Sequence, residues 1–359
     1  MKFNFKNVTL LKLYIYFGLL ALINIFFSTE NIYARTFTVN NIEISTPFEI
    51  NFDKNEIIDE GFNKAFEQMI LSIVQTKDQK KLEYTSINLI KGMVETFSIN
   101  EEKFIDNIYY LSLSVSFNKK KIFNFIQRQN IFPSLPIKKK VFFMPIIFDE
   151  NKGEIFIFSE NNLYNLWNSN IKNYHLLEYI LPTEDLEDLN LIKLNIDNLE
   201  KFKYEEIIKK YYLEDYIISI FYKNNNSIRV INKINFNNQI HLKNLKFEQL
   251  GLNKEKEILR LIENLKNVYE NFWKEKNKIN NSVKSSFFVS IGNSNNSIIS
   301  DFEEVLGNID LINNFRINKF DNNNNIYKII FNGSPDYFLK TMKSKNYEFD
   351  TNNKIWILK

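Results

Sequence analysis

The segment LPTEDLEDLN, residues 181–190, contains the densest group of side chains that could do chemistry. Glu184, Asp185, Glu187 and Asp188 place four carboxylates within five positions. Carboxylates can act as a general acid and base, bind a cation, or interact with the positive end of a helix dipole. Acid–base catalysis also requires that one of the carboxylates is desolvated, so that the two pKa values differ.

The leucines between these acids favour the start of a helix. We expect Leu181, Leu186 and Leu189 to be buried, which leaves the acids exposed with ordinary pKa values. A calcium loop needs a glycine for its sharp turn, and this segment has none. We therefore predict a strand-to-helix turn capped by Thr183 or Asp185. Ligand or partner binding by the acids, and catalysis, remain open alternatives at this stage.

Most other catalytic and cofactor motifs are excluded by residue type and spacing. The chain has eight glycines and no two of them have the spacing of a phosphate-binding loop. It has no cysteine, which excludes thiolate ligands and nucleophiles. Its two histidines, His175 and His241, fall in different predicted elements, so we expect no metal and no cofactor. We expect both to face solvent, His241 because it alternates with Ile240 and Leu242 in a predicted strand.

Trp167 offers a further alternative. The stretch NNLYNLWNSN could present an aromatic platform on which a sugar stacks. However, Trp167 follows Leu163 and Leu166 at helical spacing, which indicates a core position.

The first 34 residues predict a secretory signal peptide. Three lysines precede an apolar run, Leu13–Phe27, and the segment ends in NIYA before Arg35. An uncleaved anchor is the alternative, but the run is short of the roughly 20 residues that span a bilayer. No cysteine follows the run, which excludes a lipoprotein anchor. We expect a periplasmic protein that contacts the membrane only through this segment, if it stays uncleaved.

Charge argues against nucleic-acid binding. The whole chain has a net charge of +3, and its first 34 residues carry three lysines and one glutamate, so the remainder carries +1. A nucleic-acid-binding surface needs a basic face. With 44% hydrophobic residues and 25% charged residues, the remainder can bury several cores.

Residues 35–136 predict an N-terminal α+β domain. Alternating apolar residues on both sides of Asn40–Asn41 predict a hairpin. Apolar spacing of three and four predicts a helix over 58–73 with an N-cap at Asp53, and a second helix is expected over 85–95. In YLSLSVSF, residues 110–117, leucine, valine and phenylalanine alternate with serine, as in a strand with one buried face.

Residues 137–280 predict a central α/β layered domain. The run VFFMPIIF, residues 141–148, suits a strand buried on both faces. Helices are predicted over 160–168 and 204–212. Three strands with asparagine turns then precede a long amphipathic helix that starts near Asn253. The polar residues 274–285 predict a linker.

Residues 281–359 predict a C-terminal ferredoxin-like domain of order βαββαβ. The first strand is SFFVSI and the last is KIWIL. Ser300 with Glu303 predicts the start of the first helix, and Ser334 with Pro335 the start of the second. The predicted fold class is therefore a multidomain α+β and α/β protein.

The ordered features together resemble a known family. They are the apolar helix AFEQMILSIV, the stretch LSVSFNKKKIFNFIQRQNIFPSLPIKKKVFFMPI, then LPTEDLEDLNLI and YIISIFY. This order resembles the exported bacterial proteins grouped as domain of unknown function 2066, over about residues 36–358. The best-matching motif is a proline followed by spaced acids, here Pro182, Asp185 and Asp188. The family has no assigned activity, so the resemblance implies location and architecture, and marks these residues as candidates for an interaction.

We expect a periplasmic protein without enzymatic activity that binds a partner protein in the cell envelope. Open sheet edges and helix faces are common docking surfaces. The alternative is an envelope hydrolase that cleaves glycans with a pair of carboxylates. The oligomeric state and the identity of the partner cannot be derived from these patterns.

Overall fold

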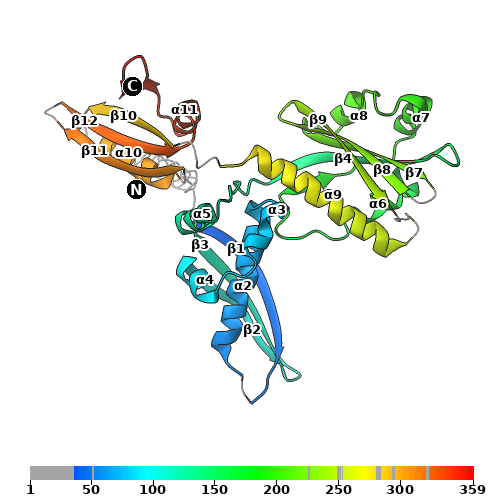
Figure 1. The fold of residues 1–359 in the computed structure, drawn as a ribbon, viewed down its shortest axis with the longest axis horizontal. Helices are drawn as coiled ribbons and strands as arrows, with labels where there is room; N and C mark the ends of the chain where they lie inside the picture. Colours follow the sequence, from blue (N-terminus) through cyan, green and yellow to red (C-terminus); the bar gives the residue numbers. More distant parts are fainter. Residues whose placement is uncertain are drawn as a thin grey trace, which may run out of the picture. The chain divides into compact units, whose positions relative to one another are not determined.

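The described residues form three β-sheets, each with helices of its own (Figure 1). This computed structural model describes residues 36–50, 52–224, 227–248, 252, 254–279, 284–292, 296–309, 311–320 and 323–359. The predicted signal segment, residues 1–34, lies outside the described residues. The mixed α+β class expected from the sequence is confirmed.

The chain divides into two compact units, and the division lies between Asn281 and Ser282. The unit of Phe37–Asn281 contains the first two sheets, and the third sheet belongs to the unit that includes Ser282–Lys359. The domain boundary expected after residue 136 falls inside the first unit. The boundary expected after residue 280 falls one residue before the division between the units.

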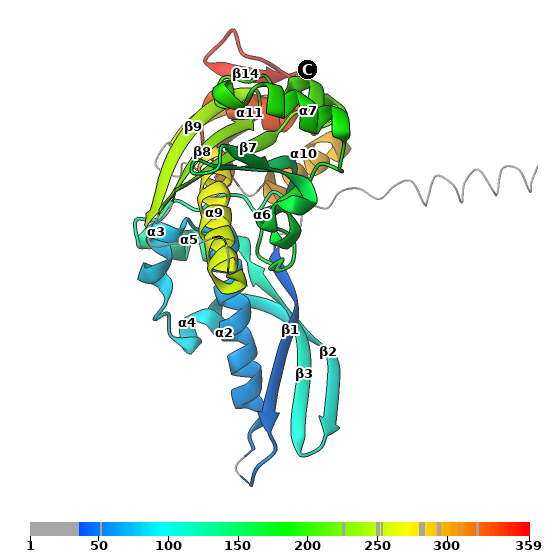
Figure 2. The same cartoon turned by 90° about the vertical axis from the view of Figure 1, so that its right-hand side faces the viewer.

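The first sheet has the strand order β1-β3-β2 and is covered on one face by a long helix (Figure 2). Its strands are β1 (Thr36–Pro47), β2 (Val94–Ile105) and β3 (Ile108–Asn118). The helices are α2 (Lys54–Ile73), α3 (Thr76–Gln79), α4 (Ile87–Met93) and α5 (Lys119–Arg128), with a short 3-10 turn, η1 (Lys80–Leu82). Asp53 caps α2 by accepting from the backbone N–H of Asn55, as predicted.

The strand β3 shows the predicted alternation. Leu111, Leu113, Val115 and Phe117 are buried, while the serines between them are only partly buried. The buried face packs against α2, where Gly61 lies so close to Leu113 that a Cβ atom there would be 2.6 Å from its Cδ2. Each large apolar side chain buried in this way stabilises the fold by roughly 1.5–3 kcal/mol.

One expectation for this region is wrong. The predicted hairpin at Asn40–Asn41 does not form, because β1 continues through both residues as one strand. Asn41 takes a left-handed conformation, φ 56°. The buried positions are Phe37 before it and Ile42 and Ile44 after it, a change of alternation that a β-bulge at Asn41 would explain. The helix expected over 85–95 is present as α4, which ends at Met93, directly before β2.

The second sheet has helices on both faces. Its strands are β4 (Lys139–Asp149), β5 (Glu154–Phe156), β6 (Leu177–Ile180), β7 (Tyr216–Asn224), β8 (Ser227–Phe236) and β9 (Gln239–Glu248). Their order is β5-β4-β7-β8-β9, and β6 pairs in parallel with β4. β7 is also parallel to β4, whereas β8 and β9 continue the sheet with antiparallel pairing.

The central strand β4 is buried on both faces, as its continuous apolar run predicted. Val141, Phe143 and Ile147 pack against α6 (Asn162–Leu166) and α9 (Glu255–Lys276). Phe142, Met144 and Ile146 pack on the opposite face. That face is covered by α7 (Leu186–Leu194), α8 (Glu205–Lys209) and the 3-10 turns η2 (Phe158–Glu160) and η3 (Ile196–Asn198).

The helix α9 extends further than predicted. It continues to Lys276, into the expected linker over 274–285, and Lys274 within it is only 5% exposed. The ammonium of Lys274 donates to the backbone carbonyls of Leu71 and Val74, at the end of α2. The end of α9 is therefore part of the core that joins the first two sheets.

The third sheet has the order β11-β12-β10-β14-β13. Its elements are β10 (Lys284–Gly292), α10 (Asn296–Asn308), β11 (Ile312–Phe320), β12 (Asn324–Asn332), α11 (Pro335–Lys343), β13 (Phe349–Asp350) and β14 (Ile355–Leu358). Ser334 caps α11 as predicted, by accepting from the N–H of Tyr337. The start predicted for the first helix is wrong, because α10 begins at Asn296 and Glu303 instead accepts a hydrogen bond from the Tyr327 hydroxyl.

The end of the third sheet contains a strand that was not predicted. β13 pairs antiparallel with β14, and β14 pairs in parallel with β10. The chain therefore turns back once more before its last strand.

Candidate functional site

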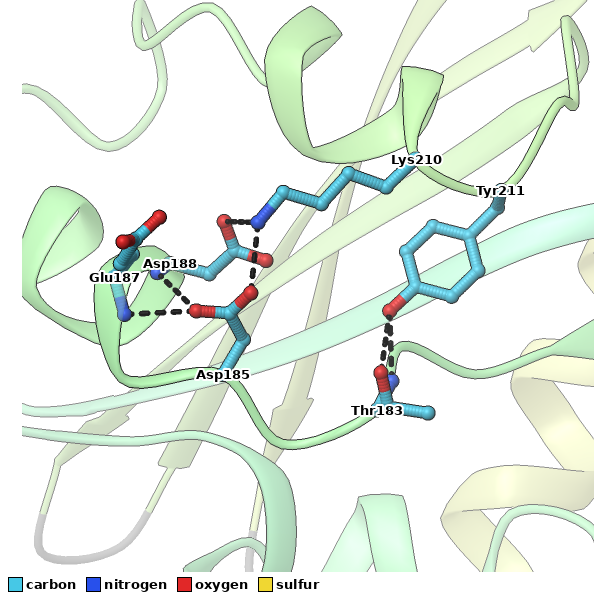
Figure 3. Close-up of polar contacts among 6 residues, drawn as sticks. All are labelled: Thr183, Asp185, Glu187, Asp188, Lys210 and Tyr211. Atoms are coloured by element: carbon cyan, nitrogen blue, oxygen red, sulfur yellow. Dashed lines mark hydrogen bonds and ion pairs between the residues drawn. The ribbon is translucent and has the colours of Figure 1, made fainter.

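Asp185 is the N-cap residue of α7, at the centre of the acidic segment (Figure 3). Its Oδ1 accepts from the backbone N–H of Glu187 at 2.8 Å and of Asp188 at 3.3 Å. Its backbone is extended, with φ −144° and ψ 121°, as is usual for an N-cap. The predicted strand-to-helix turn capped by Asp185 is confirmed.

Lys210, in the turn after α8, holds two of the acids. Its ammonium lies 2.8 Å from Oδ2 of Asp185 and 2.8 Å from Oδ1 of Asp188, as Figure 3 shows. The hydrogen bond from Lys210, helped by the two backbone N–H groups, lowers the pKa of Asp185. The two carboxylates raise the pKa of Lys210. Both groups are therefore held in their charged forms and are poorly suited to proton transfer near neutral pH.

The burial of the segment differs from expectation. Asp188 is only 3% exposed, whereas Leu186 is 76% exposed. On α7, Asp188 and Ile192 are four residues apart and face the protein, while Leu186 is rotated away from that face. The second oxygen of Asp188, Oδ2, is buried and has no hydrogen-bond partner among the described residues. Lys210 supplies the charge that compensates this buried carboxylate.

The residues before Asp185 are tied to three neighbouring elements. The Tyr164 hydroxyl, from α6, donates to the carbonyl of Pro182 at 2.7 Å. The backbone N–H of Thr183 donates to the Tyr211 hydroxyl at 2.8 Å. Glu184 accepts from the N–H of Ser159, in η2, at 3.2 Å. Of the three candidate interaction residues, Pro182 and Asp188 are buried and Asp185 is half-buried. Through these hydrogen bonds the segment connects α6, η2 and the turn after α8.

The histidines are not solvent-facing as expected. The His241 ring packs against Phe272 of α9, with 4.9 Å between ring centroids. Ile240 and Leu242 are 54% and 73% exposed, so β9 has its faces reversed relative to the prediction. His175 is also partly buried. Burial, with additional repulsion from Lys266, Lys274 and Lys172, lowers its pKa to about 4.

A row of buried charged residues on α9 was missed from the sequence. Lys266, Glu270 and Lys274 are each 5% exposed or less. Glu270 accepts from the backbone N–H groups of Leu176 at 3.0 Å and Leu177 at 2.9 Å, where β6 begins. The three residues lie four apart, next to the apolar stripe of the helix, and this spacing was the available signal.

Burial changes the acidity of this row. It lowers the pKa of Lys266 and of Lys274 to about 8, and it raises the pKa of Glu270. The Lys266 ammonium lies 5.7 Å from the ring centroids of Trp167 and Tyr179, within the range of a cation–π interaction. Through its hydrogen bonds the row connects α9 to the start of β6 and to the end of α2.

Trp167 belongs to the core. Its side chain is fully buried and stacks on Phe143 with 3.8 Å between ring centroids. The interpretation of Trp167 as a core residue is confirmed, and an exposed sugar-stacking role for it is wrong.

Within the described part of the chain, no group of three or more histidine and acidic side chains is placed to hold a metal ion. Over the same residues, none of the helices combines the length and the apolar character that crossing a bilayer requires. The fold and the acidic segment thus define a mixed α+β protein whose clustered acids connect structural elements.

No protein-family model matches the chain, and no curated protein matches it. The resemblance to domain of unknown function 2066 stays a prediction.

Proposed function

We propose that this protein is an exported, non-catalytic binding module of the cell envelope. We propose further that it binds an extended segment of a partner protein along the free edge of β2. The observation that carries this proposal is the exposure of β2. This strand forms one edge of the first sheet, and eleven of its twelve residues are exposed.

Four of the exposed side chains of β2 are large and apolar. Phe97, Ile99, Phe104 and Ile105 are 46%, 38%, 56% and 50% exposed. Edge strands that avoid association commonly carry lysines along their length. β9, an edge of the second sheet, carries Lys243 and Lys246, whereas β2 carries one lysine, Lys103, and has no charged residue from Thr96 to Asn100. An added strand would gain main-chain hydrogen bonds and cover these apolar side chains.

The geometry of the acidic segment favours neither catalysis nor ligand or partner binding by its acids. A glycan hydrolase needs two carboxylates that face each other across a cleft. Asp185 and Asp188 instead share the ammonium of Lys210. For the same reason we locate the partner surface on β2 and not at Pro182, Asp185 and Asp188 of the segment.

We also propose that the C-terminal unit is a variant of the ferredoxin-like fold. Its central strand order, β11-β12-β10-β14, supports this relation, as does the alternation of strands with α10 and α11. The parallel pairing of β14 with β10 is the departure from that fold. The short strand β13 accounts for it, because it reverses the chain before β14.

The test is site-specific photo-crosslinking in cells at Ser98, followed by mass spectrometry of the periplasmic fraction. We expect a crosslinked partner with the natural chain and its loss with Ile99→Lys, which places a charge on the edge. The matched control is Leu242→Lys, on the exposed edge strand β9, which should keep the crosslink. A partner retained equally by Ile99→Lys would disprove the β2 surface. Recovery of the chain only from the cytoplasm would disprove export.

A further inference from the structure

The edge strand β2 presents main-chain hydrogen-bonding groups on the side away from β3, where no described strand pairs with it (Figure 2). Asp106 and Asn107 join the two strands, and their φ angles of 51° and 59° are those of a type I′ turn. Ile105 lies opposite Ile108 across this two-residue turn, so these two residues form a hydrogen-bonded pair. Hydrogen-bonded and non-hydrogen-bonded pairs then alternate along β3. With the observed register, the β2 residues whose N–H and C=O groups point to the open side are Phe97, Ile99, Glu102 and Phe104.

A bulge divides this open edge into two regular stretches. The register shifts between Ile99 and Glu101, so Asn100 is the extra residue. Because a bulge bends its strand, a straight partner strand can follow only one stretch, Thr96–Ile99 or Glu101–Ile105. In the second stretch, Glu102 is already bound by the Lys54 ammonium and the Tyr109 hydroxyl. In the first stretch both open positions carry exposed apolar side chains, which favours Thr96–Ile99 as the place of pairing.

The two faces of this stretch differ in chemistry. On the α2 face, the ring centroid of Phe97 lies 5.1 Å from that of Phe62, and Ile99 lies opposite Leu113. On the other face, the Ser98 hydroxyl donates to the side chain of Asn100 at 3.2 Å. A side chain of an added strand lies on the same face as the residue directly opposite it. The added strand should therefore be apolar opposite Phe97 and Ile99 and polar opposite Ser98.

Acids flank the same stretch. Glu95 and Glu101 are exposed, and no charged residue lies between them. With three glutamates and one lysine, β2 carries a net charge of −2. Lys103 pairs with Glu101, but both side chains are more than half exposed, so this pair is weak. A partner strand with basic ends is therefore attracted to this edge, and one with acidic ends is repelled.

We propose that the segment bound at β2 is a basic, amphipathic strand, an inference that rests on the proposed function. The strand pairs with Thr96–Ile99 and places apolar side chains opposite Phe97 and Ile99. It places lysine or arginine near Glu95 and Glu101, and its remaining side chains are polar and uncharged. No covalent step is involved.

The test is an NMR titration of the full chain, labelled with ¹⁵N, with the acetylated and amidated peptide KTVTVTK at low ionic strength. We expect saturable shifts in β2 and slower solvent exchange of the amide protons of Phe97 and Ile99. The amide of Ser98, which points to β3, should change less. Amide protons of Phe97 and Ile99 that exchange slowly before any peptide is added would show that a second copy of the chain covers the edge, and would overturn the proposal.

Two comparison peptides separate charge from side-chain pattern. ETVTVTE keeps the pattern and reverses the charge of both ends. KTTVVTK has the composition of KTVTVTK, but its adjacent valines lie on opposite faces of a strand. Each should bind at least about fivefold more weakly than KTVTVTK. Equal binding of either peptide, or shifts that do not saturate, would overturn the proposal. If Ile99→Lys nevertheless abolishes the crosslink in cells, the proposed function stands and only this inference fails.

Variants locate the source of the charge preference. Glu95→Gln with Glu101→Gln changes only exposed side chains and should reduce the preference for KTVTVTK over ETVTVTE to less than about twofold. The matched control is Glu178→Gln with Glu248→Gln, two exposed acids of the second sheet, which should keep the preference. An equal reduction in the control would show general charge attraction and would overturn the proposed site.

Discussion

His175 lies among positive charges at the start of β6, beside the buried row of α9. Desolvation is the main cause of its low pKa, about 4, and Lys266, Lys274 and Lys172 add repulsion. The low pKa favours the neutral imidazole in the folded protein near neutral pH.

This burial makes stability depend on pH. In the unfolded chain a histidine has a pKa of about 6.5, so the unfolded chain gains a proton as the pH falls from 6.5 toward 4, and the folded protein does not. Stability should therefore fall over this range. We expect a loss of about 1–2 kcal/mol, below the full linkage value, because solvent reaches part of the ring.

The measurement is urea unfolding of the natural chain and of His175→Gln at pH 6.5 and pH 4.5. The other titrating groups are shared by the two proteins, so the difference between their pH dependences isolates His175. We expect the variant to lose less stability on acidification. Identical losses in both proteins would contradict a neutral, buried His175.

At the scale of elements, the close contact between α2 and β3 depends on Gly61, which has no side chain. A Cβ atom at Gly61 would lie 2.6 Å from Cδ2 of Leu113 and 3.1 Å from Cδ1 of Ile44. Real Cβ atoms do not approach so closely, so a side chain at position 61 would force the buried Leu113 side chain to move. By contrast, Gly92 in α4 has no atom within 4 Å of its Cβ position.

We therefore expect alanine substitutions at Gly61 and Gly92 to change the free energy of unfolding in opposite directions. Gly61→Ala should destabilise the first unit by about 1–3 kcal/mol, because Leu113 must move within a packed core. Gly92→Ala should stabilise it by about 0.5–1 kcal/mol, because it lowers the entropy of the unfolded chain without a clash. Thermal unfolding monitored by circular dichroism compares the two. Equal effects of both substitutions would contradict the close α2–β3 contact.

The whole molecule consists of two units with separate cores. In the C-terminal unit, Phe338 is fully buried and its ring centroid lies 4.7 Å from that of Phe287. Trp356 stacks on Phe287 at 4.8 Å. Separate cores of this kind favour separate unfolding transitions.

We expect Phe338→Ala to destabilise the C-terminal unit by about 3–5 kcal/mol, because it opens a cavity in an aromatic core. Differential scanning calorimetry should show one transition shifted to lower temperature and the other unchanged. Phe320→Ala, which truncates a side chain that is 75% exposed, serves as the control and should shift neither transition by much. An equal shift of both transitions by Phe338→Ala would show that the two units unfold together.

Local patterns were sufficient for several elements. The alternation of β3, the apolar run of β4 and the caps at Asp53, Asp185 and Ser334 were all predicted, because each depends on neighbours within a few residues. The strand β2 was missed because its exposed, mixed sequence has no clear period, and it becomes a strand by pairing with β3.

The sequence by itself determined which chemistries are absent and where most helices and strands begin, because residue types and short-range periodicity carry that information. Only the tertiary structure decided the roles of the charged residues. Asp188, Lys274 and Glu270 are polar in type, yet each is buried, because a partner distant in the sequence satisfies its charge or its hydrogen bonds. Burial depends on what the rest of the chain places opposite a residue, and a linear pattern does not contain that pairing.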